Sequence, residues 1–319
     1  MVIHSFFILL GFLSFNNFAF SNDLKIHVIE PRLRIDWSSP NSLATSSALN
    51  SSTDDYAPIG HFAVEVNCKT PYSNGARHVI SGMERKSKVE SRQITLNKKL
   101  GLGSLIYPFE GSLQSSNSTL HEISMARRDH RLKTLIIPTS EARCHAILEF
   151  IDMWIRSGSY KVYGGGKDVS SGEGAGCADF AMEIFKIATN TLPPYEWIAE
   201  IQVPLRLLGD GKNRQINFAE LLAHTSWARP NEESMNFKIA DANLVTDWII
   251  KRTPPMSEKF KYVAHIFPTG FMRSDNGLNR SFEREANQLL KTPEVFDNFT
   301  YQYPTNISPN FLWKSIKIN

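Results

Sequence analysis

Cys177 is the residue of this sequence whose surroundings best fit covalent chemistry. It follows a glycine-rich stretch, residues 158–176, and precedes a segment, residues 178–188, whose apolar side chains recur at helical spacing. Free N–H groups and the positive dipole end of a helix stabilise a thiolate and lower its pKa. The same N–H groups can hold the oxyanion of a tetrahedral intermediate, and glycines let a substrate approach closely. The pattern indicates a nucleophilic thiol, with a small buried cysteine at a helix start as the alternative.

A thiolate needs a base, and His61 is the first candidate. It opens the alternating segment 61–66 (HFAVEV), which predicts a strand, and a histidine at a strand start can project into a groove beside a helix N-terminus. His224 lies in a segment with helical spacing and fits a catalytic strand poorly. His265, on the strand-like segment 262–267, follows the cysteine and ranks second. An ordinary surface histidine is the alternative for each of them.

Residues 160–165 (YKVYGG) and 174–180 (GAGCADF) precede and surround the cysteine, and residues 60–65 (GHFAVE) surround the histidine. These motifs resemble those of the NlpC/P60 clan of papain-like hydrolases, in which a Tyr-x-x-Gly-Gly segment and a glycine-containing loop precede the nucleophile. The histidine motif comes first here, which is similar to the circularly permuted branch of that clan. The match covers residues 60–188, with Gly176 and Ala178 in place of the Asp and Ser that commonly flank the cysteine.

The resemblance also implies a third residue that orients the imidazole and a tyrosine that lines the oxyanion site. If the hairpin after the histidine strand has a long loop, His78 on the return strand faces His61 at the clan's third position. If Asn74-Gly75 forms a two-residue turn, His61 falls opposite Lys88 instead. We select His78 as the orienting residue, and Tyr160 matches the clan's oxyanion tyrosine.

The other two cysteines, Cys68 and Cys144, are expected to be structural because neither follows a glycine-rich loop. Three is an odd number, so one pair can form a disulfide in an oxidising compartment and leave at least one thiol over. No Cys/His spacing resembles a zinc site, and the sequence after the glycines at 164–166 lacks the Lys-Ser/Thr ending of a phosphate loop. The sequence implies no cofactor.

The N-terminus predicts export. Residues 5–15 form an apolar stretch as long as a signal-peptide core, and residues 19–21 (AFS) offer small residues where signal peptidase reads, so we expect a signal peptide over residues 1–21. No Lys or Arg precedes the stretch, which leaves a buried helix or an uncleaved anchor as the alternative. No later window is apolar enough to span a membrane.

A net charge of +3 without a long basic run argues against nucleic acid as a partner.

The remaining pattern predicts an α+β protein. We expect an arm and a Ser/Asn-rich linker over 22–56, with one strand or an arm at 25–36 and a loop at 38–56. A papain-like catalytic core over 57–203 and a C-terminal extension over 204–319 should follow. In the core, an antiparallel sheet that bears His61 should pack on the helix that bears Cys177. Expected strands are 61–66, one within 77–83, 132–138 and 260–267, and expected helices are 141–155 with Ser140 as its cap, one from 178, 218–227, 241–251 and 282–290.

Together these features predict an exported cysteine peptidase or amidase acting on amide bonds, with cell-wall peptides as the substrate that the resemblance favours. Two alternatives stay open. The same Cys-His pair can serve a lipid amide or ester hydrolase or an acyltransferase, and the scaffold can be that of an exported binding protein without activity. Separation of Cys177 from every candidate imidazole would favour the binding protein.

Overall fold

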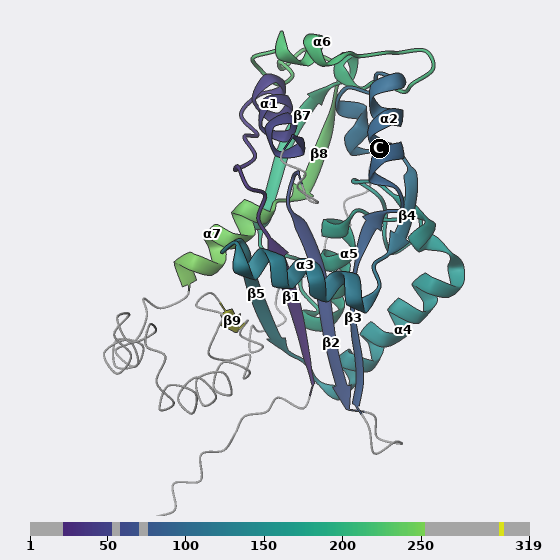
Figure 1. Ribbon diagram of the computed structural model, residues 1–319, viewed down its shortest axis with the longest axis vertical. Helices are drawn as coiled ribbons and strands as arrows, with labels where there is room; N and C mark the ends of the chain where they lie inside the picture. The colour runs from purple at the N-terminus through teal and green to yellow at the C-terminus, as the bar shows by residue number, and fades with distance from the viewer. Residues whose placement is uncertain (1–21, 53–57, 70–75, 253–299, 303–319) are drawn as a thin grey trace, which may run out of the picture.

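A computed structural model describes residues 22–52, 58–69, 76–252 and 300–302 (Figure 1). Its largest element is a seven-stranded sheet in the order β6-β4-β3-β2-β1-β5-β9. Neighbouring strands pair antiparallel, except for the parallel pair of β5 and β9. The strands of this sheet are β1 Asp23–Ile29, β2 His61–Lys69, β3 Ala76–Arg85, β4 Phe109–Leu113, β5 Leu132–Pro138, β6 Val162–Tyr163 and β9 Thr300–Gln302.

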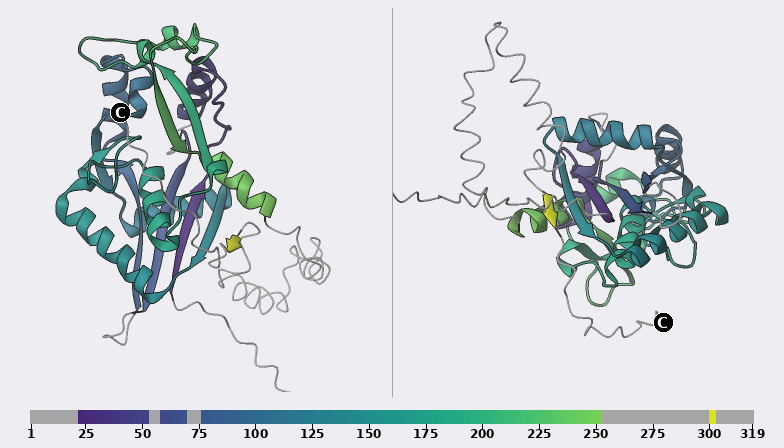
Figure 2. Two further views of the ribbon diagram at one scale, coloured as in Figure 1. Left: turned by 180° about the vertical axis from the view of Figure 1, so that it is seen from behind. Right: turned by 90° about the horizontal axis from the view of Figure 1, so that it is seen from below.

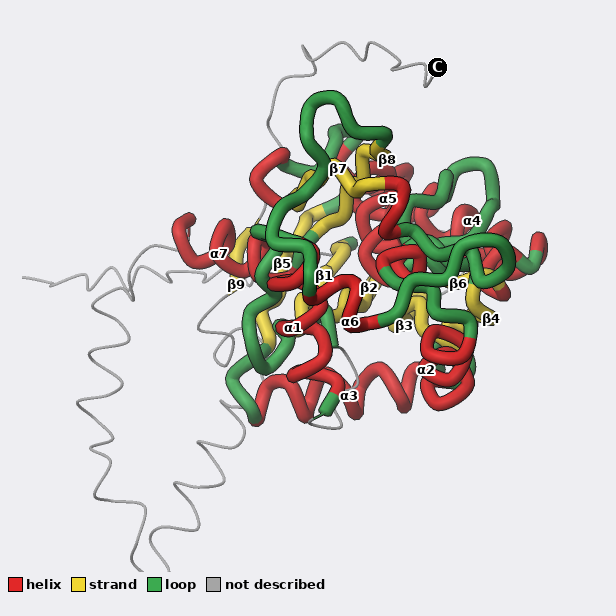
Figure 3. Tube along the Cα trace, turned by 90° about the horizontal axis from the view of Figure 1, so that it is seen from above, coloured by secondary structure: helices red, strands yellow, loops and turns green. Residues whose placement is uncertain are grey.

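Helices cover both faces of this sheet. Viewed from above, α3 lies on one side of the strands and α4 and α5 lie on the other (Figure 3). The period of two in β2 explains the arrangement, because Phe62, Val64 and Val66 point together into the core under α4 and α5. On the opposite face Ile80 of β3 packs with Ile123 of α3. The helices within the described residues are α1 Pro40–Ser51, α2 Lys88–Asn97, α3 Ser116–Arg128, α4 Glu141–Ser157, α5 Cys177–Thr189, α6 Phe218–Leu222 and α7 Ala242–Arg252. Short 3₁₀ turns occur there as well: η1 Leu102–Leu105, η2 Ser159–Lys161, η3 Tyr195–Trp197 and η4 Leu205–Leu207.

The main hydrophobic core lies between the sheet and the helices α4, α5 and α7. Phe180, Ile184 and Phe185 of α5 are at most 1% exposed and recur at the spacing that places them on one helix face. Burial of each such side chain contributes about 1.5–3 kcal/mol to folding. Val245 and Ile249 of α7 belong to the same core, so the boundary predicted after residue 203 does not separate an independent extension.

A second, smaller core lies above the sheet in Figure 1. Strands β7 Ile198–Pro204 and β8 Ser234–Ala240 form an antiparallel pair, seen from behind in Figure 2, and α1 and α6 pack beside it. The buried side chains here are Ile35, Leu43, Ala44, Leu102, Ile201, Val203, Leu207, Ile216, Leu221 and Phe237. Because β7 and β8 lie on either side of residue 204, the pair also crosses the predicted boundary.

Several predicted elements are confirmed: the α+β class with an antiparallel sheet, the strands at 61–66, 77–83 and 132–138, and the helices that begin after Ser140, at Cys177 and near residue 242. The helix predicted over 218–227 ends at Leu222. The turn at Asn74-Gly75, the strand at 260–267, the helix at 282–290 and the signal peptide at 1–21 lie outside the described residues.

The linker predicted over residues 38–56 is wrong, because residues 40–51 form helix α1. Ser39 caps it by accepting from the N–H of Ser42, and Pro40 occupies its first turn, where a missing N–H costs nothing. Asn50 then ties the helix back to the chain, since its side chain accepts from the N–H of Leu33 and donates to the carbonyl of the same residue, both at 2.8 Å. Of the two alternatives for the preceding segment, a strand or an arm, the structure forms the strand, since β1 lies between β2 and β5 within the sheet.

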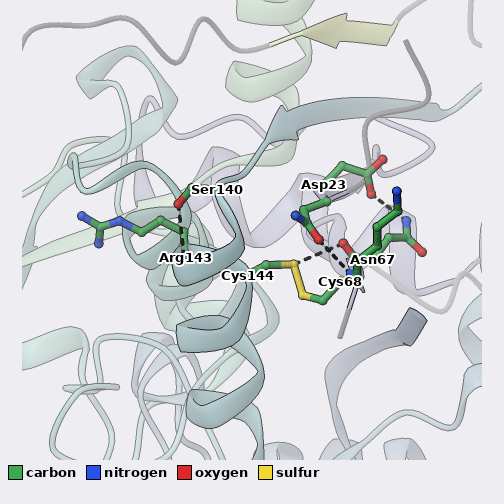
Figure 4. Close-up of a disulfide and its surroundings, with 8 residues drawn as sticks. Asp23, Asn67, Cys68, Ser140, Arg143 and Cys144 are labelled. Atoms are coloured by element: carbon green, nitrogen blue, oxygen red, sulfur yellow. Dashed lines mark hydrogen bonds between the residues drawn. A yellow bond between two sulfur atoms is a disulfide. The ribbon is translucent and has the colours of Figure 1, made fainter. Parts of the chain in front are cut away.

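A disulfide between Cys68 and Cys144 joins the end of β2 to the first turn of α4 (Figure 4). The two Cα atoms are 5.7 Å apart, and both residues are fully buried. This pairing leaves Cys177 as the free cysteine, consistent with the structural role expected for the other two.

Over the described ranges, no helix combines the length and the apolar character needed to cross a bilayer.

Candidate active site

Cys177 is the first residue of α5, and Asp179 fixes the loop that leads to it. The Asp179 carboxylate accepts from the N–H of Gly176 at 3.3 Å and from the N–H of Gly166. It therefore joins the two ends of the loop 166–176. Burial raises the pKa of Asp179 to about 6 against these hydrogen bonds. The helix dipole points its positive end at the Cys177 sulfur.

The Cys177 thiol is 7% exposed and has a lowered pKa. Burial disfavours the thiolate, but the charge of His61 and a hydrogen bond with its imidazole outweigh that cost. The N–H of Phe62 and the hydroxyl of Tyr163 also donate to the sulfur. A buried thiol whose neighbours stabilise the anion is a nucleophile, whereas a buried thiol in apolar surroundings is inert.

His61 shows the reciprocal effect. Burial of the ring lowers its pKa, but the Cys177 thiolate, a hydrogen bond to that sulfur and the Glu122 carboxylate together raise the pKa to about 9. The two residues therefore form a thiolate–imidazolium pair, and the titrations belong to the pair more than to either residue.

The second imidazole nitrogen of His61 is held by Gln114, the residue that follows β4. Nε2 of the ring lies 3.1 Å from Gln114 Oε1 and 3.6 Å from Glu122 Oε2 on α3. The Gln114 amide nitrogen donates to that same Glu122 oxygen at 2.7 Å. Because a carboxylate only accepts, the amide must turn its NH₂ to Glu122 and its oxygen to the ring. Nε2 must then carry a proton, which leaves Nδ1 to accept the proton of the thiol.

Gly82 on β3 makes room for this arrangement. A Cβ at this position would lie 2.7 Å from Gln114 Oε1, closer than real Cβ atoms approach, and 3.0 Å from His61 Nε2, which is tighter than most such contacts. Gln114 is itself 4% exposed and anchored by its backbone, whose N–H donates to the Gly82 carbonyl and whose carbonyl accepts from the Ser81 hydroxyl. The packing therefore holds the ring, the amide and the strand in one geometry.

Tyr163 lies on the other side of the sulfur. Its hydroxyl is 3.7 Å from Cys177 Sγ and also accepts from the Cys177 N–H. The Cys177 N–H and the Tyr163 hydroxyl thus lie together beside the Cys177 sulfur, and two donors at such a position can stabilise an oxyanion once they turn to it. Burial, followed by the neighbouring thiolate, raises the pKa of Tyr163 well above its usual value, so the hydroxyl stays protonated.

The structure brings two of the residues selected from the sequence together, Cys177 and His61, and leaves His78 and Tyr160 outside their contacts. His78 pairs with Asn67 across the β2–β3 ladder, six residues or about 20 Å from His61 along the strand. Its imidazole instead lies 3.3 Å from Glu65. The selection of His78 is therefore wrong, since the β2–β3 register is shifted from the one assumed.

Tyr160 lies in the turn η2 and packs against the main core, and Tyr163 of the same motif contacts the cysteine instead. Of the alternative bases, His224 forms a hydrogen bond with Arg206, not with Cys177, and is therefore not part of the site. His265 lies outside the described residues.

Sequence reasoning missed Gln114, Glu122, Gly82 and Tyr163. Gln114 and Glu122 come from a loop and a helix 53 and 61 positions after His61, with no motif around either. Tyr163 stood within the quoted YKVYGG motif, and its place immediately before the glycines was the signal that could have identified it.

Within the parts of the chain that the structure describes, no group of three or more His, Cys, Asp or Glu side chains is arranged to hold a metal ion. Comparison of the chain with protein-family models, with curated proteins and with solved structures finds no significant match. The site is therefore interpreted from its own geometry.

Proposed function

We propose that this protein is a cysteine hydrolase that cleaves amide bonds, with Cys177 as nucleophile and His61 as base and acid. The observation that carries the proposal is the pairing of a buried thiol of lowered pKa with an imidazole whose pKa is raised to about 9. An imidazole whose far nitrogen is fixed by Gln114 is prepared to take a proton from the thiol and return it.

The proposed reaction has two halves. The Cys177 thiolate attacks the amide carbonyl carbon, and the Cys177 N–H and the Tyr163 hydroxyl stabilise the oxygen that becomes negative. The His61 imidazolium donates its proton to the leaving nitrogen, the C–N bond breaks, and a thioester and a free amine remain. Water then attacks the thioester while His61 takes a proton from it, and the carboxylic acid leaves as the thiol is restored.

The order of elements supports a permuted papain-like core as the finer description of the fold. A strand that begins with the histidine precedes the helix that begins with the cysteine, and that helix packs on the antiparallel sheet. This agrees with the resemblance of residues 60–188 to the permuted branch of the NlpC/P60 clan. The resemblance favours peptide amides of the cell wall as substrates.

The Cys68–Cys144 disulfide supports export, because protein disulfides persist in oxidising compartments and are rare in the cytosol. It agrees with the signal peptide expected at residues 1–21. We infer a periplasmic or secreted location. A reporter protein fused after residue 21 tests this inference. The reporter should leave the cytoplasm, and its retention there would contradict export.

Release of soluble peptide fragments from purified cell-wall material tests the activity. Wild-type protein should release them, and Cys177→Ala should release none while keeping the wild-type circular dichroism spectrum. Cys177 should also be the position labelled by iodoacetamide at neutral pH, in an amount that falls in His61→Ala. His265→Ala is the matched control, with wild-type release expected. Equal release by Cys177→Ala would refute the proposal.

The contact between the thiol and the imidazole argues against an inactive binding protein on the same scaffold. Nothing in the geometry of the dyad itself favours lipid amides or acyl transfer over peptides. A panel of fatty-acyl amides and esters beside the wall material separates the two substrate classes.

A further inference from the structure

Arg85, at the end of β3, is a charged side chain near the dyad that the proposed reaction does not use. Its guanidinium lies over the ring of Phe109, 4.2 Å from the centroid, and 5.6 Å from the centroid of the Tyr163 ring. The alternation of β3 puts Arg85 on the face of Met83, which belongs to the same core as Cys177. The guanidinium therefore contacts two aromatic rings, one of which belongs to the tyrosine beside Cys177.

This guanidinium has no carboxylate partner in the described part of the chain. Buried or half-buried arginines are ordinarily paired with Asp or Glu, because removing an unpaired charge from water is costly. The pKa of Arg85 is instead lowered by burial, and the groups that favour its charge are the Tyr163 hydroxyl and the Cys177 thiol, with no carboxylate among them. The N–H donors of the Arg85 guanidinium, which are arranged to bind a carboxylate through two parallel hydrogen bonds, thus lie near Cys177 without a carboxylate acceptor.

We propose that Arg85 binds a carboxylate of the substrate that lies within about one residue of the scissile amide. The inference rests on the proposed hydrolase function and narrows its substrate class to amides with a neighbouring free carboxylate. Cation–π contacts with Phe109 and Tyr163 hold the guanidinium in place before the substrate binds. A bound carboxylate supplies the carboxylate partner that the described part of the chain does not give Arg85.

Two peptides of the same sequence, one with the free carboxylate next to the scissile amide and one with that group as a primary amide, test the proposal. Wild-type protein should cleave the carboxylate peptide with a kcat/KM about 10- to 100-fold higher, the range that a charge-assisted hydrogen bond gives. Arg85→Gln should lose this preference by slowing only the carboxylate peptide, with less than about threefold change on the amide peptide. Arg85→Lys should fall between them, because it keeps the charge and loses the fork.

The outcomes separate the two proposals. No cleavage of either peptide by the wild type would contradict the hydrolase function, whereas equal cleavage of both would refute only the carboxylate site. Equal loss on both peptides in Arg85→Gln, with the acid limb of Cys177 alkylation moved to higher pH, would show that Arg85 acts on the thiolate and would also overturn the carboxylate proposal. If Arg85→Gln fails to fold, the comparison of the two peptides with wild-type protein still tests the proposal, because equal cleavage of both would refute it.

Discussion

The Gln114 amide should set the pH range over which the site works, and Gln114→Met tests this. The substitution keeps the length of the side chain and removes the acceptor that lies 3.1 Å from His61 Nε2. A hydrogen bond to a charged group is worth about 1.5–3 kcal/mol, and one pKa unit corresponds to about 1.4 kcal/mol. The ring is 8% exposed, so water cannot replace the lost partner.

The pKa of His61 should therefore fall from about 9 by roughly one to two units in Gln114→Met. The imidazolium of His61 is lost as the pH rises through the pKa of His61. A lower pKa therefore moves the basic limb of the pH–activity profile to lower pH, by the same one to two units. The Cys177 thiolate loses part of its counter-charge, so the acid limb should move to higher pH. Activity at neutral pH should drop about 10- to 100-fold, since the tautomer is no longer fixed.

The assay has two readouts taken over the same pH series. Hydrolysis of an amide substrate reports both limbs, and the rate of Cys177 alkylation by iodoacetamide reports the thiolate alone. Gln202→Met is the matched control, because Gln202 is exposed on β7 and its side chain accepts a hydrogen bond from the Ser234 hydroxyl. A profile of unchanged width in Gln114→Met, with activity within twofold of wild type, would refute the assignment of Gln114 as the residue that orients His61.

Four further outcomes follow from the geometry. Gly82→Ala should lower kcat about 10- to 100-fold, because the added Cβ would displace the His61 ring and a shift of about 1 Å has that effect on catalysis; wild-type kcat would show that the strand yields without moving the ring. Tyr163→Phe should reduce kcat by a similar factor with little change in KM, since the hydroxyl acts on the developing oxyanion, and a change confined to KM would contradict that role. The wild-type pH–activity profile should lose its activity as the pH rises through about 9, where His61 loses its proton, and a basic limb near the ordinary histidine pKa would show that the thiolate does not hold the imidazolium. Replacing Cys68 and Cys144 together by alanine should lower the free energy of unfolding in urea by about 4 kcal/mol, the value expected for a closed loop of this length, while Cys177 remains reactive; unchanged stability would contradict the entropic argument.

Local patterns predicted the elements that bear the dyad. The alternation that starts at His61 and the helical spacing after Cys177 each specify an element from residues within one short segment. The strand Leu132–Pro138 and the helix capped by Ser140 were predicted for the same reason. In each case the alternation of a strand or the apolar face of a helix lies within one short segment.

Helix α1 shows where such patterns fail. Its sequence is rich in Ser and Asn and has few apolar residues, so neither propensity nor amphipathicity predicts a helix. Packing against α6 and the two hydrogen bonds between Asn50 and Leu33 stabilise it instead. The cap at Ser39 followed by Pro40 was the local indication, and it carries weight only with that packing.

That Cys177 begins a helix after a glycine-rich loop, and that His61 begins a strand, follows from residues close to each of them, because helical spacing and strand alternation are local properties. The surroundings of these two residues depend on tertiary packing. The β2–β3 register moved His78 away from His61, and the approach of a loop and α3 brought Gln114 and Glu122 to the ring. Such contacts depend on how distant segments pack, and no spacing along one chain specifies them.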